Sequence, residues 1–258
     1  MAKIITVANQ KGGVGKTTTS VNVAAGLGVS EVKTLIIDLD PQSNATQGLG
    51  IDPNEVENST YEMMIEKEKV ADCITPTDIP FLDIIAANPR LVGAEIELVS
   101  VIGRESILKK ALEPIQDDYE YIVIDCPPSL GLLTLNALAA SNSILIPIQC
   151  EYYAMEGLGQ LLNTIRLVQK SLNKKLQIEG VLLTMFDSRL RLSQEVAEQI
   201  KDHFKDKLYK SIIRRNVRLG ESPSFGKPII LYDASSAGSQ DYMSLVGEIL
   251  KNDGKKIG

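Results

Sequence analysis

The sequence predicts an α/β domain in which a doubly wound, mostly parallel β-sheet has helices packed on both faces. Two observations lead to this fold class. Short apolar runs, bounded by polar or glycine residues, alternate along the chain with longer segments of helical periodicity. The apolar runs are continuous, which is typical of strands that are covered on both faces of a parallel sheet. A chain of 258 residues suits one such domain, so we expect residues 1–258 to form a single unit.

The positions of these runs predict the individual elements. The predicted strands, in chain order, span residues 3–8, 34–38, 82–86, 121–125, 143–148, 178–184 and 208–213. The predicted helices span residues 17–27, 95–112, 132–140, 155–170, 193–204 and 240–251. We interpret residues 53–80 as an insertion without assigned chemistry, and residues 251–258 as a disordered tail.

The composition is ordinary for a globular protein, with 44% hydrophobic and 23% charged residues. No apolar run approaches the ~18 residues that a membrane span needs. The first predicted strand begins too early to leave room for a signal peptide. The cysteines (Cys73, Cys126 and Cys150) share no metal-binding spacing, and their odd number argues against a disulfide framework. We therefore expect a cytoplasmic protein without membrane attachment.

The first predicted strand leads through a glycine-rich turn into a helical stretch, which is the context that a phosphate-binding loop requires. The turn reads Lys11-Gly12-Gly13-Val14-Gly15-Lys16-Thr17-Thr18. Glycines let backbone N–H groups converge on phosphate oxygens, and the start of the helix favours the same anion. We expect Lys16 to lie against the β- and γ-phosphates and the Thr17 hydroxyl to bind Mg²⁺. A plain glycine turn would need no Lys-Thr pair at the start of the helix.

The loop departs from the usual phosphate-loop pattern in one respect. Gln10 stands five residues before Gly15, where a glycine is usual, and a second lysine, Lys11, precedes the glycine pair. This motif resembles the deviant Walker A motif of the ParA/MinD family of P-loop ATPases. In that family the extra lysine reaches across a nucleotide-sandwich dimer, where a second cation offsets charge on the transferring phosphoryl group. The resemblance implies an ATP-dependent homodimer with Lys11 and Lys16 as catalytic residues.

Two later strands end in aspartate, as the metal and water chemistry of a phosphate-loop ATPase requires. Asp125 ends an apolar run and fits a Walker B element that holds Mg²⁺ directly or through water. The run that ends at Asp38 continues as Asp38-Leu39-Asp40-Pro41-Gln42, which is similar to the switch I segment of the family. This resemblance implies that Asp40 positions the attacking water and that Asp38 is an outer group of the metal site. Gly131 would be the mobile glycine of switch II.

The resemblance covers most of the chain and becomes specific again beyond residue 147, toward the chromosomal ParA, or Soj, branch of the family. Residues 147–158 resemble a segment that family members place near the dimer interface. In relatives, residues from the segments that match the surroundings of Met185 and Asn216 enclose the adenine, so the resemblance implies a base-binding role for both. Arg214 stands where relatives usually have proline, a departure that affects one backbone contact to the base but not ATP binding as such.

Charge is distributed unevenly along the chain. The net charge of −6 does not favour a nucleic-acid binder. Residues 185–230, however, contain ten Lys or Arg against six Asp or Glu, so this basic window carries +4 and the remainder −10. Charge alone is consistent with a solvated face of surface ion pairs. The resemblance favours DNA, because arginines that match Arg189 and Arg218 make the nonspecific DNA contacts of the family.

The resemblance leads to the hypothesis of a ParA-type partitioning ATPase. ATP would close the homodimer, the dimer would bind double-stranded DNA nonspecifically, and a ParB-type centromere-binding partner would stimulate hydrolysis and release it. The cofactors would be ATP and Mg²⁺, intrinsic hydrolysis would be slow, and the cytoplasmic protein would associate with the nucleoid.

Other members of the same superfamily remain alternatives. A MinD-type membrane-associated ATPase should end in a basic amphipathic helix, but the stretch after Leu250 is short and interrupted by Gly254. Nitrogenase-reductase-like relatives bridge an iron–sulfur cluster with cysteines, and Cys126 and Cys150 are misplaced for that role. Ligases of amide or biotin pathways would need a substrate pocket, which the sequence does not identify.

Overall fold

The structure of the protein, a computed structural model, describes residues 1–151 and 154–255. Its centre is one eight-stranded sheet with the strand order β3-β4-β2-β5-β1-β6-β7-β8. The strands are β1 (Lys3–Val7), β2 (Thr34–Asp38), β3 (Ile74–Pro76), β4 (Leu82–Ile85), β5 (Tyr121–Asp125), β6 (Ser143–Gln149), β7 (Gln177–Phe186) and β8 (Leu208–Arg214). All neighbouring strands run parallel except β3, which pairs antiparallel with β4 at one edge of the sheet.

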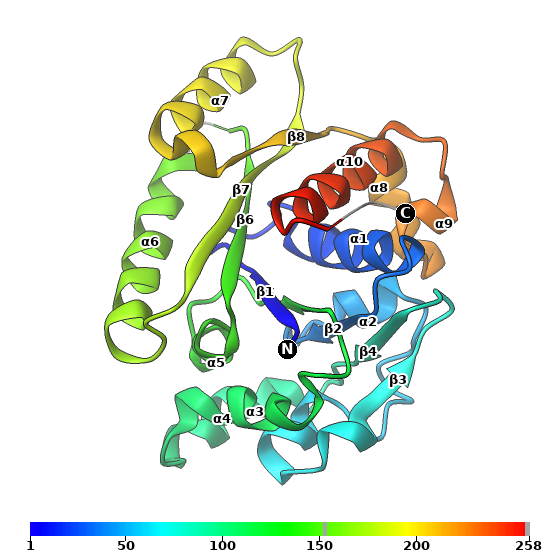
Figure 1. The fold of residues 1–258 in the computed structure, drawn as a ribbon, viewed down its shortest axis with the longest axis vertical. Coiled ribbons are helices and arrows are strands. Elements are labelled where there is room, and N and C mark those ends of the chain that lie inside the picture. Colours follow the sequence, from blue (N-terminus) through cyan, green and yellow to red (C-terminus); the bar gives the residue numbers. More distant parts are fainter. Residues whose placement is uncertain (152–153, 256–258) are drawn as a thin grey trace.

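Helices cover both faces of this sheet (Figure 1). The α-helices are α1 (Lys16–Val29), α2 (Asn44–Gly48), α3 (Leu91–Glu97), α4 (Ile107–Leu112), α5 (Leu132–Ala140), α6 (Ala154–Ser171), α7 (Arg191–Phe204), α8 (Val217–Glu221), α9 (Ile229–Tyr232) and α10 (Ala237–Asn252). Shorter 3₁₀ or π turns occupy Glu62–Glu66, Val70–Cys73, Leu98–Ser100, Arg104–Ser106, Glu113–Ile115, Lys205–Lys207 and Ser222–Phe225. In Figure 1, α1 and α10 lie on one side of the sheet, and α5 and α6 lie on the other.

Alternate residues of each buried strand point into two separate hydrophobic cores. In β5, Ile122 and Ile124 belong to the core that α3 to α7 cover, whereas Tyr121 and Val123 belong to the core that α1 and α10 cover. All five residues of β5 are buried, and complete burial of one aliphatic side chain is worth about 1.5–3 kcal/mol. Burial on both faces explains why the strands appear in the sequence as continuous apolar runs.

The predicted fold class is confirmed, and so are all seven predicted strands, with ends within two residues of the observed ones. Five of the six predicted helices are also confirmed, with ends within three residues. The sequence did not predict β3, α2, α8 or α9. These elements have three to five residues each, which is too short to show a hydrophobic period.

The predicted helix over residues 95–112 is wrong. The chain instead forms α3, two 3₁₀ turns and then α4. Val101 is extended, with ψ at 128°, and Gly103 has a φ of 72°, so no continuous α-helix can pass through this segment. The apolar residues on both sides of the break follow a helical spacing, which hid the interruption from the sequence pattern.

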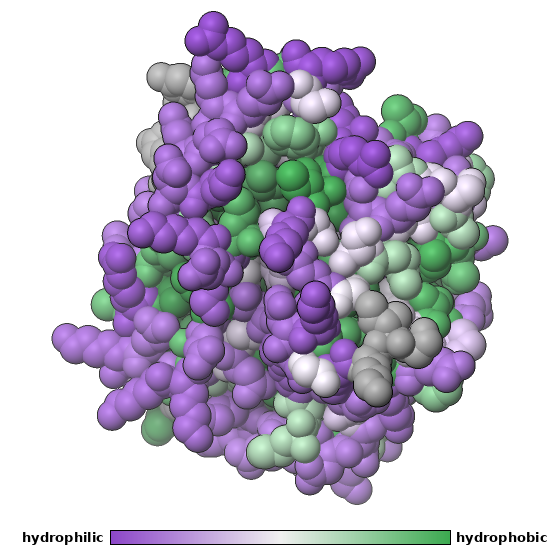
Figure 2. All heavy atoms as spheres, turned by 45° about the horizontal axis from the view of Figure 1, so that its top comes forward, coloured by the Kyte–Doolittle hydropathy of each residue, from purple (hydrophilic) through white to green (hydrophobic). Residues whose placement is uncertain are grey.

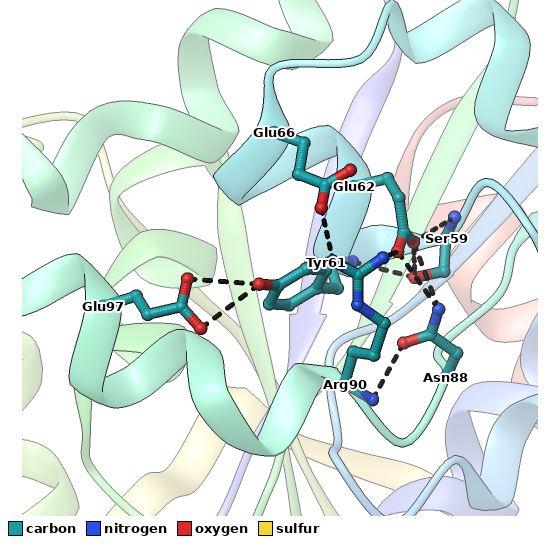
Figure 3. Close-up of polar contacts among 7 residues, drawn as sticks. All are labelled: Ser59, Tyr61, Glu62, Glu66, Asn88, Arg90 and Glu97. Atoms are coloured by element: carbon teal, nitrogen blue, oxygen red, sulfur yellow. Dashed lines mark hydrogen bonds and ion pairs between the residues drawn. The ribbon is translucent and has the colours of Figure 1, made fainter.

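A polar network around the buried carboxylate of Glu62 ties the segment interpreted as an insertion to Asn88, Arg90 and α3. It joins Ser59, Tyr61, Glu62, Glu66, Asn88, Arg90 and Glu97 (Figure 3). The buried carboxylate of Glu62 accepts hydrogen bonds from the Ser59 and Asn88 side chains and pairs with Arg90 at 2.7 Å. The Arg90 guanidinium also lies 4.3 Å from the centroid of the Tyr61 ring. Hydrogen bonds and charge together satisfy the buried groups, so this segment is anchored to the sheet rather than loosely inserted.

Part of the expected disordered tail at residues 251–258 makes defined contacts. Helix α10 continues to Asn252. Asp253 accepts a hydrogen bond from the Tyr121 hydroxyl at 2.6 Å, and Lys255 pairs with Glu120 at 2.7 Å. Asp253 and Lys255 thus contact the first residue of β5 and the residue before it. Residues 256–258 lie outside the described part of the chain.

Polar side chains cover most of the face shown in Figure 2, and apolar side chains gather in a recess near its middle. Among the described residues, no helix combines the length and the apolar character that crossing a membrane requires.

Candidate active site

The glycine-rich loop lies at the edge of the sheet where the parallel strands end. β1 ends at Val7, the loop follows, and α1 begins at Lys16. Strand β1 lies between β5 and β6, where the strand order reverses, and ligands of open α/β sheets bind in the crevice at such a point. Gly13 and Gly15 have φ values of 73° and 85°, a left-handed conformation that glycine adopts without strain. The loop therefore has the backbone shape that encloses an anion at the start of α1.

The two lysines of the loop occupy different environments. Lys16 is 7% exposed, and its ammonium donates to the carbonyl oxygen of Lys11 at 3.1 Å. Burial lowers the pKa of Lys16, and the nearby carboxylates of Asp125 and Asp40 oppose this effect. The Lys11 ammonium lies 3.0 Å from Oε2 of Glu151, in an ion pair whose side chains are 33% and 48% exposed. Lys16 is thus held inside the site, and Lys11 lies at its rim.

Asp38 and Asp125 are partners in the register of neighbouring strands β2 and β5, so their carboxylates enter the site side by side. Both residues are completely buried. Burial raises the pKa of Asp125, and the charge of Asp38 raises it further. Burial also raises the pKa of Asp38. Two buried carboxylates disfavour each other's ionisation, so a cation bound between or beside them would be stabilised.

One oxygen of Asp125 is suited to bind a metal ion. Its Oδ1 accepts a hydrogen bond from the Ser20 hydroxyl at 2.7 Å, whereas its Oδ2 is buried and finds no hydrogen-bond partner among the described residues. Anionic oxygen is the ligand that Mg²⁺ prefers. Within residues 1–151 and 154–255, no group of three or more His, Cys, Asp or Glu could hold a metal ion by itself. The residues therefore fit a Mg²⁺ that shares Asp125 and the Thr17 hydroxyl with phosphate and water, as nucleotide sites do.

Asp38 and Asp40 are fixed by hydrogen bonds within the chain. Both Thr46 N–H and Thr46 Oγ1 donate to Oδ2 of Asp38, at 2.9 and 2.7 Å, and Asp40 N–H donates to its Oδ1 at 3.1 Å. Because both oxygens of Asp38 already accept hydrogen bonds, the residue is suited to a place near the metal ion without direct contact to it. Asp40 is 5% exposed, and its Oδ1 accepts a hydrogen bond from Gln42 N–H at 2.9 Å.

A cavity of about 360 Å³ lies beside the phosphate loop, between the ends of β7 and β8. Gly15 and Thr18 border it from the loop, and Met185 and Asn216 border it from the strand ends. Asn216 also caps α8, because its Oδ1 accepts a hydrogen bond from Arg218 N–H at 2.8 Å. The structure thus brings both predicted base-binding residues to one cavity, whose size is in the range of small-molecule sites.

Arg214 makes two contacts with the carboxylate of Asp241. The Arg214 backbone N–H donates to Oδ2 of Asp241 at 3.0 Å, a bond that proline could not make. The Arg214 guanidinium pairs with the same carboxylate at 2.6 Å. This double contact ties the end of β8 to α10 beside the cavity, so Arg214 links two elements that border the candidate base site.

The arginines predicted to contact DNA lie at the same edge of the sheet, outside the cavity. Arg189 follows β7 and Arg218 lies in α8, after β8, and these two strands are parallel neighbours. Arg189 pairs with Asp187 at 2.6 Å and Arg218 with Glu221 at 2.9 Å, and the two arginine side chains are 85% and 54% exposed. Exposed ion pairs are worth about 0–1 kcal/mol, so a phosphate can compete for either guanidinium.

Sequence reasoning missed two hydroxyl residues that hold the carboxylates. Ser20 follows Lys16 by one helical turn, so a search of the same helix face could have found it. Thr46 lies in α2, which gave no sequence signal, and only the folded chain brings it to Asp38. Of the residues 147–158 predicted near a dimer interface, residues 152–153 and the side chains of 154–157 lie outside the described part. Cys126 and Cys150 are both buried free thiols.

The chain is similar to known proteins over nearly its whole length. A family model described as an AAA domain matches residues 2–178. The sporulation initiation inhibitor protein Soj of Bacillus subtilis is 58% identical over 252 residues, which cover 98% of this chain and 100% of that protein. The chromosome partitioning protein ParA of Myxococcus xanthus is 52% identical over 256 residues, which cover 99% and 90%. The solved structure of cobyrinic acid a,c-diamide synthase from Mycobacterium smegmatis with bound ADP and magnesium has a TM-score of 0.86 and 35% identity, covering 100% of this chain and 98% of that one.

Proposed function

The chain belongs to the ParA/Soj family of chromosome-partitioning ATPases, and we propose that it acts as an ATP-dependent DNA-partitioning switch. Its ATP-bound form is a homodimer that binds double-stranded DNA without sequence preference and so associates with the nucleoid in the cytoplasm. A ParB-type centromere-binding protein stimulates hydrolysis and returns the protein to its monomeric form. High identity to partitioning proteins over nearly the whole chain supports this cycle.

The arrangement around Asp125 is the observation that carries the proposal. A buried carboxylate, one oxygen of which has no hydrogen-bond partner among the described residues, lies near the buried Lys16, at the end of the glycine-rich loop where α1 begins. ATP with Mg²⁺ supplies both missing partners at once: phosphates for Lys16 and a cation for Asp125. The magnesium and ADP bound to the structural relative from M. smegmatis support the same ligand pair here.

Each residue of the site has a role in hydrolysis. Thr17 and Asp125 would hold Mg²⁺, which would supply positive charge to offset that of the phosphates. Lys16 would bind the same phosphates. Asp40 orients the attacking water and accepts its proton, which requires a fixed carboxylate. The bonds that Asp40 makes through its backbone to Asp38 and through its side chain to Gln42 provide that fixed position.

Lys11 links hydrolysis to dimerisation. Its ion pair with Glu151 is partly exposed and therefore worth at most about 1 kcal/mol. Phosphates of the nucleotide in a second subunit carry more charge than one carboxylate and can displace Glu151. Lys11 therefore forms an ion pair with Glu151 in the monomer and contacts the phosphates of the other subunit's nucleotide in the ATP-bound dimer.

The alternatives have less support. An amide-forming enzyme shares this fold, but the identity to the partitioning proteins is higher than the 35% to the diamide synthase. A membrane-positioning ATPase needs an amphipathic basic helix after the last strand. Helix α10 instead packs against the core through residues such as Leu245 and Ile249, and two described residues that follow it, Asp253 and Lys255, make polar contacts.

Light scattering with different nucleotides tests the proposal. We expect a mass near 28.1 kDa without nucleotide or with ADP, and twice that mass with ATP and Mg²⁺ in the Asp40→Ala variant, which retains ATP. Lys11→Ala in the same background should stay monomeric while it still binds ATP, because only the contact across the dimer is lost. A mass that does not respond to ATP would contradict the proposed cycle.

A further inference from the structure

The two arginines predicted to contact DNA are each paired with a carboxylate of the same chain. Arg189 follows β7, and its guanidinium lies against Asp187, two residues earlier. Arg218 lies in α8, and its guanidinium pairs with Glu221 about one helical turn later. Each of these candidate DNA-binding groups therefore has an internal anion as its partner.

The pair of Asp187 and Arg189 has the geometry of a strong ion pair. Nε and Nη2 of Arg189 donate to Oδ1 and Oδ2 of Asp187 at 2.9 and 2.6 Å, so the guanidinium binds both oxygens. The Arg189 backbone N–H also donates to Oδ1 at 3.0 Å, which fixes the carboxylate within the turn. Hydrogen bonds from Arg189 lower the pKa of Asp187 to about 2, so the carboxylate stays charged at neutral pH. The aspartate side chain is 11% exposed and the arginine side chain 85%, so the guanidinium is the group that can move away.

Two carboxylates hold Arg218. Its Nη1 donates to Oε2 of Glu221 at 2.9 Å, and its Nε lies 3.6 Å from Oδ2 of Asp233. The Tyr232 hydroxyl donates to the same oxygen of Glu221 at 3.2 Å. Glu221 therefore keeps a hydrogen-bond donor when Arg218 turns toward another anion, which lowers the cost of the exchange.

Two other ion pairs of the basic window are ordinary contacts along one helix. In α7, Arg191 pairs with Glu195 at 2.7 Å. Lys201 lies 3.8 Å from Glu198 in the same helix. The two glutamate side chains are 53% and 71% exposed, compared with 11% for Asp187. These pairs carry the same charges as the two arginine pairs above, but their cations are not predicted to contact DNA, so they provide a matched control.

A DNA phosphate has to replace the internal carboxylate before either arginine can bind it. The energy of the new contact is reduced by the loss of the old one, so each arginine contributes little to DNA affinity by itself. A dimer presents both arginines twice, and the small contributions combine when one duplex contacts all of them. The internal carboxylates therefore make strong DNA binding depend on the dimer.

We propose that the carboxylates of Asp187 and Glu221 compete with DNA phosphates for the two arginines and thereby limit the DNA affinity of a single subunit. The inference rests on the proposed function, because it assigns a means of regulation to the proposed DNA-binding surface. Only a form that presents all of these arginines together, as the ATP-bound dimer does, then displaces the carboxylates.

Isosteric neutralisation tests this inference in the full-length protein. The test variant carries Asp187→Asn and Glu221→Gln, which remove the charge and keep a side-chain oxygen that accepts hydrogen bonds. The control variant carries Glu195→Gln and Glu198→Gln, which remove the same charge from α7. Both pairs of substitutions are made in the Asp40→Ala background, which holds the ATP-bound form.

Fluorescence anisotropy with a labelled duplex of arbitrary sequence, in the presence of ATP and Mg²⁺, measures the DNA affinity of each variant. We expect a rise of about tenfold in the test variant and of less than about threefold in the control. A dimer breaks four of the arginine pairs, so a gain of about 1.8-fold from each accounts for the tenfold rise. The slope of log affinity against log salt should stay within about 1 of the parent value, because the number of phosphate contacts does not change.

A double-mutant cycle separates competition from simple repulsion. If Asp187 only repelled the phosphates, Asp187→Asn would raise DNA affinity equally with and without Arg189. Competition predicts a gain of about threefold when Arg189 is present and of less than about 1.5-fold in the Arg189→Ala background. Thermal unfolding checks that each variant is folded, and this single substitution keeps the test decisive if the test variant with two substitutions unfolds.

The outcomes separate the inference from the function on which it rests. Equal gains in the test and control variants, or a gain from Asp187→Asn that persists in the Arg189→Ala background, overturn the competition alone. Absence of DNA binding by the Asp40→Ala parent with ATP overturns the proposed function and this inference with it.

Discussion

The edge of the sheet that carries the phosphate loop and the strand-end aspartates, here called the nucleotide edge, differs from the basic window of residues 185–230. Its charged side chains are buried, whereas those of the basic window are exposed. At the nucleotide edge, Lys16, Asp38 and Asp125 are 7% exposed or less, and one oxygen of Asp125 has no partner among the described residues. In the basic window, Arg189 and Arg218 are more than half exposed, and each pairs with a nearby carboxylate. Buried charge is costly unless a ligand completes it, whereas exposed charge is nearly neutral for stability.

This difference indicates how each region recognises its ligand. The nucleotide edge depends on a few fixed groups, so one substitution should remove most of the binding or the catalysis. The basic window adds small contributions from many exposed cations, so each substitution should have a modest effect that depends on salt. Four variants test this contrast.

Lys16→Ala should have the largest effect. Removing the buried ammonium leaves the phosphates without their main cation, so we expect ATP affinity to fall at least 1000-fold, which is about 4 kcal/mol. Titration calorimetry with ATP and Mg²⁺ measures this loss, and Lys109→Ala, an exposed lysine of α4, is the control. Affinity within tenfold of the unmodified protein would show that Lys16 does not face the nucleotide.

Asp40→Ala should separate binding from hydrolysis. We expect ATP affinity to stay within about threefold, because Asp40 acts on the water rather than on the bound nucleotide. Turnover should fall about 100-fold or more, the usual scale for loss of a positioned base. Phosphate release under saturating ATP measures the change, and unchanged turnover would remove Asp40 from the mechanism.

Asp125→Asn should stabilise the protein when nucleotide and Mg²⁺ are absent. The native pKa of Asp125 is raised by burial and by Asp38, so between about pH 4 and that raised pKa the native state binds more protons than the unfolded state. The stability of the unmodified protein therefore falls as the pH rises through this range, and asparagine removes the cost of the buried charge. We expect a gain of about 2 kcal/mol at pH 8 and a smaller gain at pH 6.

Urea unfolding at both pH values measures the effect of Asp125→Asn. The same variant should lose Mg²⁺-dependent hydrolysis, because it lacks the anionic ligand. A nucleotide-free variant that is less stable than the unmodified protein at pH 8 would contradict our account of the buried carboxylates.

Arg189→Ala with Arg218→Ala should have the smallest effect, and that effect should be confined to DNA. We expect DNA affinity to fall about tenfold, and the slope of log affinity against log salt to decrease by about 2, one for each lost phosphate contact. ATP affinity should not change, and stability should change by less than about 0.5 kcal/mol. Lys109→Ala with Lys110→Ala removes the same charge from α4 as a control. If both pairs weaken DNA binding equally, net charge and not the basic window accounts for it.

The sequence predicted most of the sheet because strands that are buried on both faces are apolar at nearly every position. Such strands appear in the sequence as continuous apolar runs. The phosphate loop and the strand-end aspartates could be predicted because the chemistry and the local structure share a few adjacent residues. The break at Val101–Gly103 could not, since apolar residues with helical spacing continue on both sides of it.

Features that depend on distant segments were beyond the sequence pattern. Thr46 holds Asp38 only because α2 folds back on β2. Arg214 ends β8 and its partner Asp241 lies in α10, so their double contact became clear only in the folded chain.

Binding to a nonspecific DNA duplex, measured at two salt concentrations without nucleotide, with ADP and with ATP, tests the central claim most directly. Our account predicts binding with ATP only, and a marked loss of that binding at the higher salt concentration, because exposed arginines contact phosphates only in the dimer that ATP closes. Absence of binding under every condition, or equal binding with and without ATP, would contradict the account of this protein as an ATP-dependent DNA-partitioning switch.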